Sequence, residues 1–226
     1  MLAILLLMAT VFATSQAYSV RQANAYIDFI LREPFIKEAQ YSRIDPYKVP
    51  DIHVSLISRR ITDNEAKLTK GSILNLSRVR RSGDCSVPLW QSANVTFNCV
   101  LQFPGLAVNY TANVTYDSMQ LIFYPKADVR DTEVSIQITT TKEENIPNLK
   151  LFFVTDVGHM KVTTKMITIG DISNVITPPI RDAILEQATT NMHKALNGRF
   201  KDALAFSIYK TPVPFVGDFS QIVNSK

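Results

Sequence analysis

The feature that most limits the fold is a series of segments in which apolar and polar residues alternate. In residues 94–103 the apolar positions are Val95, Phe97, Cys99, Leu101 and Phe103. The same alternation runs through residues 106–116 and 133–139, and more weakly around Leu68, Leu74, Leu76, Leu149, Leu151, Phe153, Val162, Thr164 and Met166. Successive side chains of a strand point to opposite faces, so this pattern predicts antiparallel strands with one buried and one hydrated face.

Helix-like segments flank the strands. From Val20 to Gln40, apolar residues recur in steps of three and four, which predicts an amphipathic helix with a kink or break at Pro34. A second helix is expected after Thr177, because threonine favours the N-cap and the two following prolines suit the first helical turn. Its apolar stripe runs from Ile180 to Leu204 and is weakened locally at Gly198.

The order of helix, strands and helix predicts an α+β fold, in which a curved antiparallel sheet wraps both long helices as a super-roll. Residues 18–206 are expected to form this single domain, and residues 207–226 a loosely ordered tail. The segment Phe103-Pro104-Gly105-Leu106 resembles a tight hairpin, although Pro-Gly favours turn types that suit two-residue hairpins poorly. Residues 44–51 contain two prolines and are expected to form an extended linker.

The N-terminus resembles a secretory signal peptide. Residues 2–13 are almost entirely apolar, but this run is shorter than the about twenty residues that a membrane-spanning helix needs. Ser15 and Ala17 are small residues placed as in a cleavage site, so residues 1–17 are interpreted as a signal removed after Ala17. No later segment has the length and apolar character of a transmembrane helix. The mature chain is therefore expected to be soluble, secreted and extracellular.

Composition leaves little material for catalysis or metal binding. The chain of 226 residues has 7 glycines, 3 histidines and 2 cysteines, and it contains neither G-x-S-x-G nor H-E-x-x-H. His53, His159 and His193 lie far apart without a ligand pattern, so each is interpreted as a surface or capping residue. The acidic patch in residues 128–133 lacks the glycine and closing glutamate of a calcium loop. We therefore predict a protein that is not an enzyme and that has no cofactor and no metal.

Asparagine sequons indicate N-glycosylation of a secreted chain. Four N-x-[ST] sequons make Asn75, Asn94, Asn109 and Asn113 candidate glycan sites. Asn109 and Asn113 alternate with apolar residues of the same predicted strand, so they are expected to face solvent on the side opposite the helices. At least two of Asn94, Asn109 and Asn113 are expected to carry glycans, and none is expected to line a groove.

Cysteine usage agrees with secretion. Cys85 and Cys99 are the two cysteines of the chain, and an oxidising compartment favours a disulfide between them. The alternative is a pair of free buried thiols, which requires that the chain is not secreted.

Several connecting segments resemble the group-seven mite allergens. They are Asp45-Pro46-Tyr47-Lys48-Val49-Pro50-Asp51, Leu76-Ser77-Arg78-Val79-Arg80-Arg81-Ser82-Gly83-Asp84, and the helix entry Thr177-Pro178-Pro179-Ile180. That family is similar in fold to the N-terminal half of bactericidal/permeability-increasing proteins, the tubular lipid-binding superfamily. The resemblance covers residues 19–204 and implies a super-rolled sheet, an apolar groove, and binding of lipids or other amphiphiles. The chain departs from the family in its predicted disulfide, its sequons and its tail.

An apolar groove between the helix stripes and the inward strand positions is predicted to bind an acyl chain, in a carrier role or in binding bacterial amphiphiles. The candidate lining residues are Ile27, Ile30, Leu31, Phe97, Leu101, Val108, Tyr110, Ile136, Ile138, Phe153, Ile184 and Leu196. The alternative is a ligand-free secreted glycoprotein whose outer surface acts on another protein. The two differ in whether the interior is filled by large side chains such as Phe97, Tyr110, Tyr116, Phe152 and Phe153.

Basic residues gather in one stretch of the chain. They are Arg59, Arg60, Lys67, Lys70, Arg78, Arg80 and Arg81. A basic strand end beside an apolar groove suits an anionic headgroup. The alternative is a hydrated strand edge whose charge opposes edge-to-edge pairing. Nucleic-acid binding is not expected, because the net charge is only +4 and aromatic residues do not alternate with the basic ones as base stacking requires.

Overall fold

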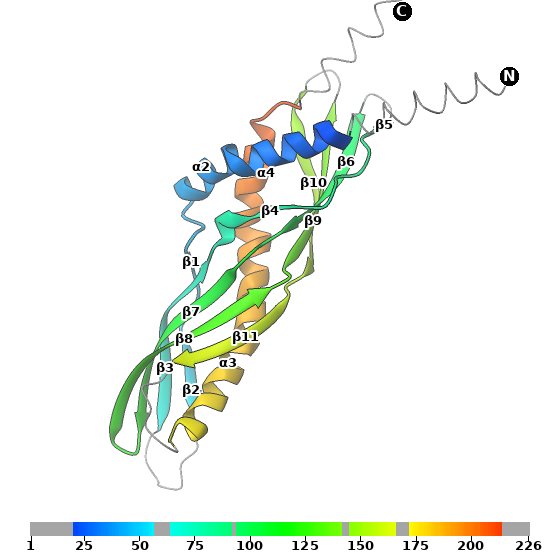
Figure 1. Ribbon diagram of the computed structural model, residues 1–226. Coiled ribbons are helices and arrows are strands. Elements are labelled where there is room, and N and C mark those ends of the chain that lie inside the picture. The colour runs from blue at the N-terminus through cyan, green and yellow to red at the C-terminus, as the bar shows by residue number, and fades with distance from the viewer. Residues whose placement is uncertain (1–19, 57–63, 92–93, 142–144, 166–171, 214–226) are drawn as a thin grey trace, which may run out of the picture.

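The computed structural model describes residues 20–56, 64–91, 94–141, 145–165 and 172–213 (Figure 1). The predicted signal peptide, Arg59, Arg60 and the end of the predicted tail lie outside these residues.

The N-terminal helical segment is broken where the sequence predicts. One helix spans residues 20–32, a turn follows at Glu33, and helix α2 (Pro34–Tyr41) begins at the proline. A proline has no N–H group to donate, so it fits the first turn of a new helix and interrupts a continuous one. Ile27, Ile30 and Phe35 are almost completely buried, which confirms the apolar stripe.

Eleven strands lie between the helical ends in the described part of the chain. They are β1 (Tyr47–Lys48), β2 (Ile52–Ser55), β3 (Glu65–Leu74), β4 (Arg80–Ser82), β5 (Leu89–Gln91), β6 (Asn94–Gln102), β7 (Leu106–Tyr116), β8 (Met119–Arg130), β9 (Glu133–Thr141), β10 (Pro147–Asp156) and β11 (His159–Lys165). The long strands fall where the alternating pattern predicts them, except β8, which no predicted segment covers. Residues 44–51, expected to be an extended linker, contain the short strand β1.

The strands form two antiparallel sheets and not one. The six-stranded sheet has the order β1-β3-β7-β8-β11 with β2 also paired to β3, and the five-stranded sheet has the order β10-β9-β6-β4 with β5 also paired to β6. The hairpin expected at Phe103-Pro104-Gly105-Leu106 is wrong, because β6 and β7 belong to different sheets. A turn lies at Pro104–Gly105, and Pro-Gly turns tend to splay the strands that they join.

The C-terminal helix begins earlier than expected. Helix α3 (Ile172–Ala195) contains Pro178 and Pro179 in its interior, so the predicted N-cap at Thr177 is wrong. Ile176 and Ile180, on either side of the prolines, are completely buried, and this packing offsets the missing backbone donors. A π-type turn at Leu196–Phe200, with non-helical backbone angles at Gly198, separates α3 from helix α4 (Lys201–Tyr209).

The expected tail is partly ordered. Helix α4 continues past residue 207 to Tyr209, and Val213 is completely buried, with its N–H donating to the side-chain oxygen of Asn145.

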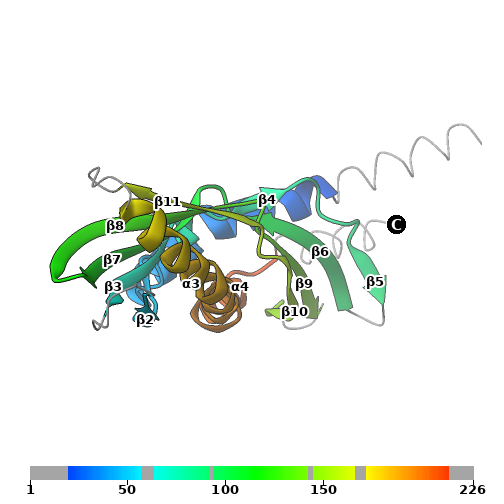
Figure 2. The same cartoon turned by 90° about the horizontal axis from the view of Figure 1, so that it is seen from below.

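The six-stranded sheet curves around α3, as the view in Figure 2 shows, and the 20–32 helix and α2 lie near α4 at the other end of the molecule (Figure 1). Phe200 joins the parts of the core: its ring centroid lies 5.0 Å from those of Phe35 and Phe103 and 6.1 Å from that of Phe152. The structure confirms an α+β fold with a curved antiparallel sheet and helices at both ends.

Candidate functional site

The inner face of the six-stranded sheet is apolar along its whole width. Directly paired residues of antiparallel strands share a face, so the register defines rows of side chains across the sheet. One row is Ile52, Leu68, Ala112 and Phe123, and the next is Val54, Ala66, Val114 and Leu121. These rows face α3.

Helix α3 covers this inner face. It contacts both edge strands of the sheet, β2 and β11, as well as β8. Its residues Ile176, Ile180, Ile184 and Ala188 are completely buried. The sheet and the helix therefore enclose an apolar layer, which we name the trough: the inner faces of β2, β3, β7, β8 and β11 together with α3.

Burial within the trough is graded from its centre to its rim. Leu68, Ala112 and Val108 on the central strands are completely buried. The inward apolar residues on the edge strands and at the end of the sheet are only half-buried, and Val175 of α3 is 44 % exposed. The half-buried set is Ile52, Val54, Tyr116, Leu121, Met160 and Val162. We name the half-buried apolar rim between the helix and each edge strand a seam.

A polar pair is buried in the otherwise apolar trough. Tyr110 and Asn191 are each 3 % exposed. The side chain of Asn191 hydrogen-bonds to the Tyr110 hydroxyl, which also donates to the carbonyl oxygen of Pro50 at 3.4 Å. Burial raises the pKa of Tyr110 to about 12, so the phenol is neutral at physiological pH.

We expect alkaline conditions to destabilise the protein through Tyr110. The phenol titrates near pH 10 in the unfolded chain and near pH 12 in the folded one. Between these values the unfolded chain loses a proton that the folded chain keeps, so the free energy of unfolding falls as the pH rises through this window. Below pH 10 the contribution is fully present and constant.

Urea unfolding of the wild type and of Tyr110→Phe at a series of pH values tests this dependence. The variant should lose stability less steeply above pH 10, and some slope should remain because burial also raises the pKa of Tyr26. Parallel pH profiles of the two proteins would contradict the assignment to Tyr110.

The residues predicted to line a groove, apart from Phe153, all belong to one cluster of buried core side chains. Val108, Tyr110 and Ile184 lie on the trough. Ile27, Ile30 and Leu31 are buried residues of the 20–32 helix, and Phe97, Leu101, Ile136 and Ile138 are buried on the five-stranded sheet. Leu196 is buried at the start of the π-type turn. Phe153 is 66 % exposed, so its side chain points to the side opposite the expected one. Whether the other residues line a groove stays a prediction.

The large side chains that could fill the interior in place of a groove differ in how deeply they are buried. Phe97 and Tyr110 fill the interior, with 1 % and 3 % of their surface exposed. Tyr116 and Phe152 are half-buried, and Phe153 points outward. Large side chains thus fill the centre of the molecule, and the apolar side chains of the seams stay half-buried.

Sequence reasoning missed most of the rim of the trough. Ile52 and Val54 belong to a four-residue strand, which is too short for alternation to stand out. Val162 lies in a segment whose alternation is weak, because threonines occupy positions 163 and 164. The contact of both edge strands with α3 is a tertiary feature with no local signal in the sequence.

The sequon asparagines do not face the helices. Asn94 and Asn113 are exposed, Asn109 is half-buried, and the intervening Val108 and Tyr110 face inward. This confirms the predicted strand faces for Asn94 and Asn113, whereas the side-chain oxygen of Asn109 is buried and has no hydrogen-bond partner among the described residues. Asn75 is half-buried, and its side-chain amide donates to the carbonyl oxygen of Gly105 at 2.7 Å. Occupancy of the four sites stays a prediction.

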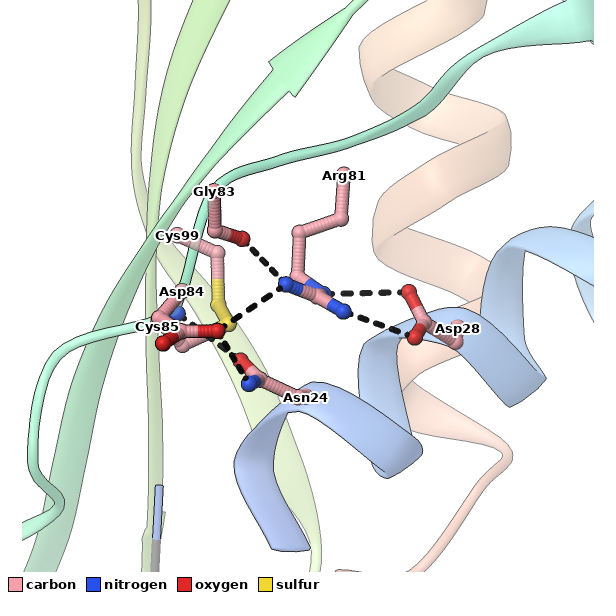
Figure 3. Close-up of polar contacts among 7 residues, drawn as sticks. All are labelled: Asn24, Asp28, Arg81, Gly83, Asp84, Cys85 and Cys99. Carbon is pink, nitrogen blue, oxygen red and sulfur yellow. Dashed lines mark hydrogen bonds and ion pairs between the residues drawn. A yellow bond between two sulfur atoms is a disulfide. The ribbon is translucent and has the colours of Figure 1, made fainter. Parts of the chain in front are cut away.

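The predicted disulfide is present, and it belongs to a polar cluster shown in Figure 3. Cys85 is bonded to Cys99, and the Cys85 N–H donates to the side-chain oxygen of Asn24 at 2.8 Å. The Asn24 amide in turn donates to Asp84 at 2.8 Å. The loop that carries Cys85 is thereby tied to the 20–32 helix.

Arg81 adds a second tie between the same two elements. Its guanidinium donates to both carboxylate oxygens of Asp28, at 3.1 and 2.9 Å, and to the carbonyl oxygen of Gly83 (Figure 3). Asp84 lies 3.6 Å from the same guanidinium. The Arg81 side chain is only 18 % exposed. The sequence analysis placed Arg81 in a possible headgroup site. In the structure its guanidinium instead binds the 20–32 helix of its own chain.

We expect the Arg81–Asp28 pair to contribute about 1–2 kcal/mol to stability, because two charge-assisted hydrogen bonds form at a partly buried site. A double-mutant cycle with Asp28→Ala and Arg81→Ala measures this coupling by urea unfolding. The matched control is the Lys67–Glu65 pair, whose side chains are 49 % and 45 % exposed. That cycle should give no more than about 0.5 kcal/mol. Equal couplings in the two cycles would contradict a structural role for Arg81.

Among the described residues, no helix is both long enough and apolar enough to cross a membrane. No protein-family model matches the sequence, and no curated protein matches it.

Solved structures do resemble this fold. The crystal structure of lipopolysaccharide binding protein matches with a TM-score of 0.50 and 11 % sequence identity, over 85 % of this chain and 40 % of that chain. Takeout 1 from Epiphyas postvittana matches with a TM-score of 0.39 and 13 % identity, over 75 % of this chain and 82 % of that chain. This chain therefore spans less than half the length of lipopolysaccharide binding protein.

At such identities the first likeness establishes the fold. The chain folds like part of lipopolysaccharide binding protein. This confirms the fold that the broader resemblance implies. The narrower resemblance to the group-seven mite allergens is not confirmed and stays a prediction.

Proposed function

We propose that this protein binds a lipid or another amphiphilic molecule, with the apolar part of the ligand in the seams of the trough, and catalyses no reaction. The observation that carries the proposal is the half-burial of inward apolar side chains on both edge strands beside α3. Side chains that face a core are ordinarily buried, so incomplete burial marks space that an apolar ligand can fill.

Binding in the seams gains free energy from the surface that it removes from water. Each methylene group of an acyl chain contributes about 0.8 kcal/mol when it is fully buried. The ligand also completes the burial of residues such as Val54, Leu121 and Val162. The fold supports the proposal, because lipopolysaccharide binding protein is by its name a protein that binds an amphiphile.

The proposal includes the setting of the protein. The described residues from 20 to 213 form the ligand-binding domain, its larger sheet rolls around the helix as a super-roll, and residues 1–17 are a secretion signal. The Cys85–Cys99 disulfide supports secretion, because disulfides persist in oxidising compartments. Glycans on the exposed sequons fit the same setting.

A matched pair of substitutions on β2 tests the site. Val54 is half-buried and faces the trough, whereas the adjacent His53 is exposed on the opposite face. Both Val54→Asp and His53→Asp add one negative charge at the same edge. We expect Val54→Asp to weaken the binding of a fluorescent fatty acid by at least roughly tenfold, because a carboxylate cannot be buried cheaply in an apolar seam. His53→Asp should bind like the wild type.

The secreted protein is also examined by native mass spectrometry followed by organic extraction. A co-purifying amphiphile that is lost in Val54→Asp supports the proposal. Absence of probe binding by the wild type at micromolar concentration would overturn it. Equal binding by Val54→Asp and His53→Asp would place the ligand outside the trough.

A second candidate function rests on the outer face of the six-stranded sheet. Ile122 and Tyr124 of β8 are 66 % and 68 % exposed, and Asn113 is paired directly with Ile122. These exposed side chains favour the alternative of a secreted glycoprotein that contacts another protein through its surface. Loss of partner binding in Ile122→Ser, with lipid binding unchanged, would support this function.

A further inference from the structure

A pocket of about 620 Å³ opens where the chain leaves α2 and enters β1. Its polar lining comes from Gln40, Arg43, Asp45, Tyr47, Lys48 and, from a distant part of the chain, Arg199. Arg43 follows α2, Lys48 lies in β1, and Arg199 lies in the π-type turn between α3 and α4. Three separate elements thus bring three cationic side chains to one cavity.

Local backbone geometry places two of these cations. Arg43 has a positive φ of 50°, which turns the chain sharply at the end of α2. Gly198 has non-helical angles (φ −98°, ψ −116°), which interrupt the C-terminal helix beside Arg199. The Arg199 guanidinium carbon lies 6.0 Å from the centroid of the Tyr47 ring, in reach of a cation–π interaction.

The carboxylate in this pocket is already engaged elsewhere. One oxygen of Asp45 accepts the Asn75 N–H at 3.0 Å. Its other oxygen accepts both the N–H, at 2.9 Å, and the hydroxyl of Ser77. These bonds direct Asp45 toward the segment after β3 and leave less of its acceptor capacity for the cations.

The three cations have no ion-pair partner among the described residues, whose ion pairs involve other side chains. Arg43, Lys48 and Arg199 are all exposed to solvent. With three cations and one carboxylate, the lining carries a formal charge of +2. The side chains of Gln40 and Tyr47 supply further hydrogen-bond donors.

We propose that this basic pocket binds an oxyanion of the phosphate class. Guanidinium groups match phosphate oxygens in a two-pronged geometry, and a lysine ammonium adds a point charge. The phosphate can belong to a lipid headgroup or to a small free phosphate compound. The pocket involves none of the residues of the trough, so this inference stands apart from apolar ligand binding.

The test compares two variants of the full chain that lose the same charge. Arg43→Gln/Arg199→Gln removes two cations from the basic pocket. Lys150→Gln/Lys161→Gln removes two exposed lysines from β10 and β11, which do not line it. Circular dichroism and thermal unfolding confirm that both variants fold. Val54→Asp is included to separate this site from the trough.

Two probes distinguish the sources of the phosphate. Inorganic phosphate is titrated by calorimetry, and flotation measures binding to phosphatidylcholine vesicles with and without phosphatidic acid. We expect Arg43→Gln/Arg199→Gln to weaken binding of at least one phosphate probe by roughly tenfold, with the lysine variant close to the wild type. Added salt should weaken the same binding.

Each outcome decides one point. Loss of inorganic phosphate binding in the pocket variant supports a site for free phosphate compounds. Loss confined to phosphatidic acid vesicles supports a headgroup site. Equal effects of the two double variants, or no phosphate binding by the wild type, would overturn the proposal. Fatty-acid binding that survives in the pocket variant and fails in Val54→Asp shows that the two sites are independent.

Discussion

Phe200→Ala is expected to lower the free energy of unfolding by about 3–5 kcal/mol, the usual range for truncating a buried phenylalanine. Phe200 is completely buried, and its ring lies 5.0 Å from the rings of Phe35 and Phe103. Phe35 comes from α2 and Phe103 from the segment between β6 and β7, whereas Phe200 itself lies in the π-type turn between α3 and α4. The substitution therefore leaves a cavity where separate elements meet.

Guanidinium unfolding followed by circular dichroism measures this loss. The control is Phe206→Ala in the same C-terminal helical region, where the side chain is 44 % exposed. It should lose about 1 kcal/mol or less, because little buried surface is removed. Similar losses in the two variants would show that Phe200 does not hold the elements together.

Gly158→Ala is expected to lower the free energy of unfolding by at least about 3 kcal/mol, because it combines backbone strain with a steric clash. Gly158 has a positive φ of 85°, in the turn between β10 and β11. A Cβ atom built there would overlap the backbone carbonyl oxygen of Arg130 at the end of β8. A backbone atom cannot move aside as the end of a flexible side chain can.

Gly105→Ala separates strain from clash. Gly105 also has a positive φ, of 71°, but no atom lies within 4 Å of the position that its Cβ would take. Its cost should be near the about 1–2 kcal/mol of a left-handed non-glycine residue. Urea unfolding compares the two variants. If the two variants lose the same stability, the expected clash between a Cβ atom at position 158 and the Arg130 carbonyl oxygen is wrong.

The secondary structure can be predicted from the sequence where an element has one buried face and one hydrated face. Alternation in β7 predicts which residues face inward, and Val108 and Tyr110 do so. The break at Pro34 follows from the missing backbone donor of proline. The start of α3 does not, because burial of Ile176 and Ile180 outweighs the local preference of two prolines to begin a helix.

The sequence predicts fewer features of the candidate sites. Residue type indicates that Ile27 and Ile136 are buried, but not whether they line a groove or fill a core. Division of the strands into two sheets depends on the turn at Pro104–Gly105, whose local pattern is that of a hairpin. The basic pocket joins Arg43 and Lys48 to Arg199, and only the folded chain brings residues so distant in sequence together.

The contact of α3 with both edge strands has a consequence for the rate at which ligands exchange. On the proposed function, a ligand that reaches the buried centre of the trough passes between α3 and β2 or β11, which are in contact, so we expect these contacts to act as a gate. Entry then requires an opening motion whose rate belongs to the protein and not to the ligand. In stopped-flow mixing, we expect the loading rate to level off at high ligand concentration, at a plateau common to ligands of different chain length. A disulfide engineered between α3 and an edge strand should lower that plateau and should also slow release, so that a loaded protein keeps its ligand through dilution.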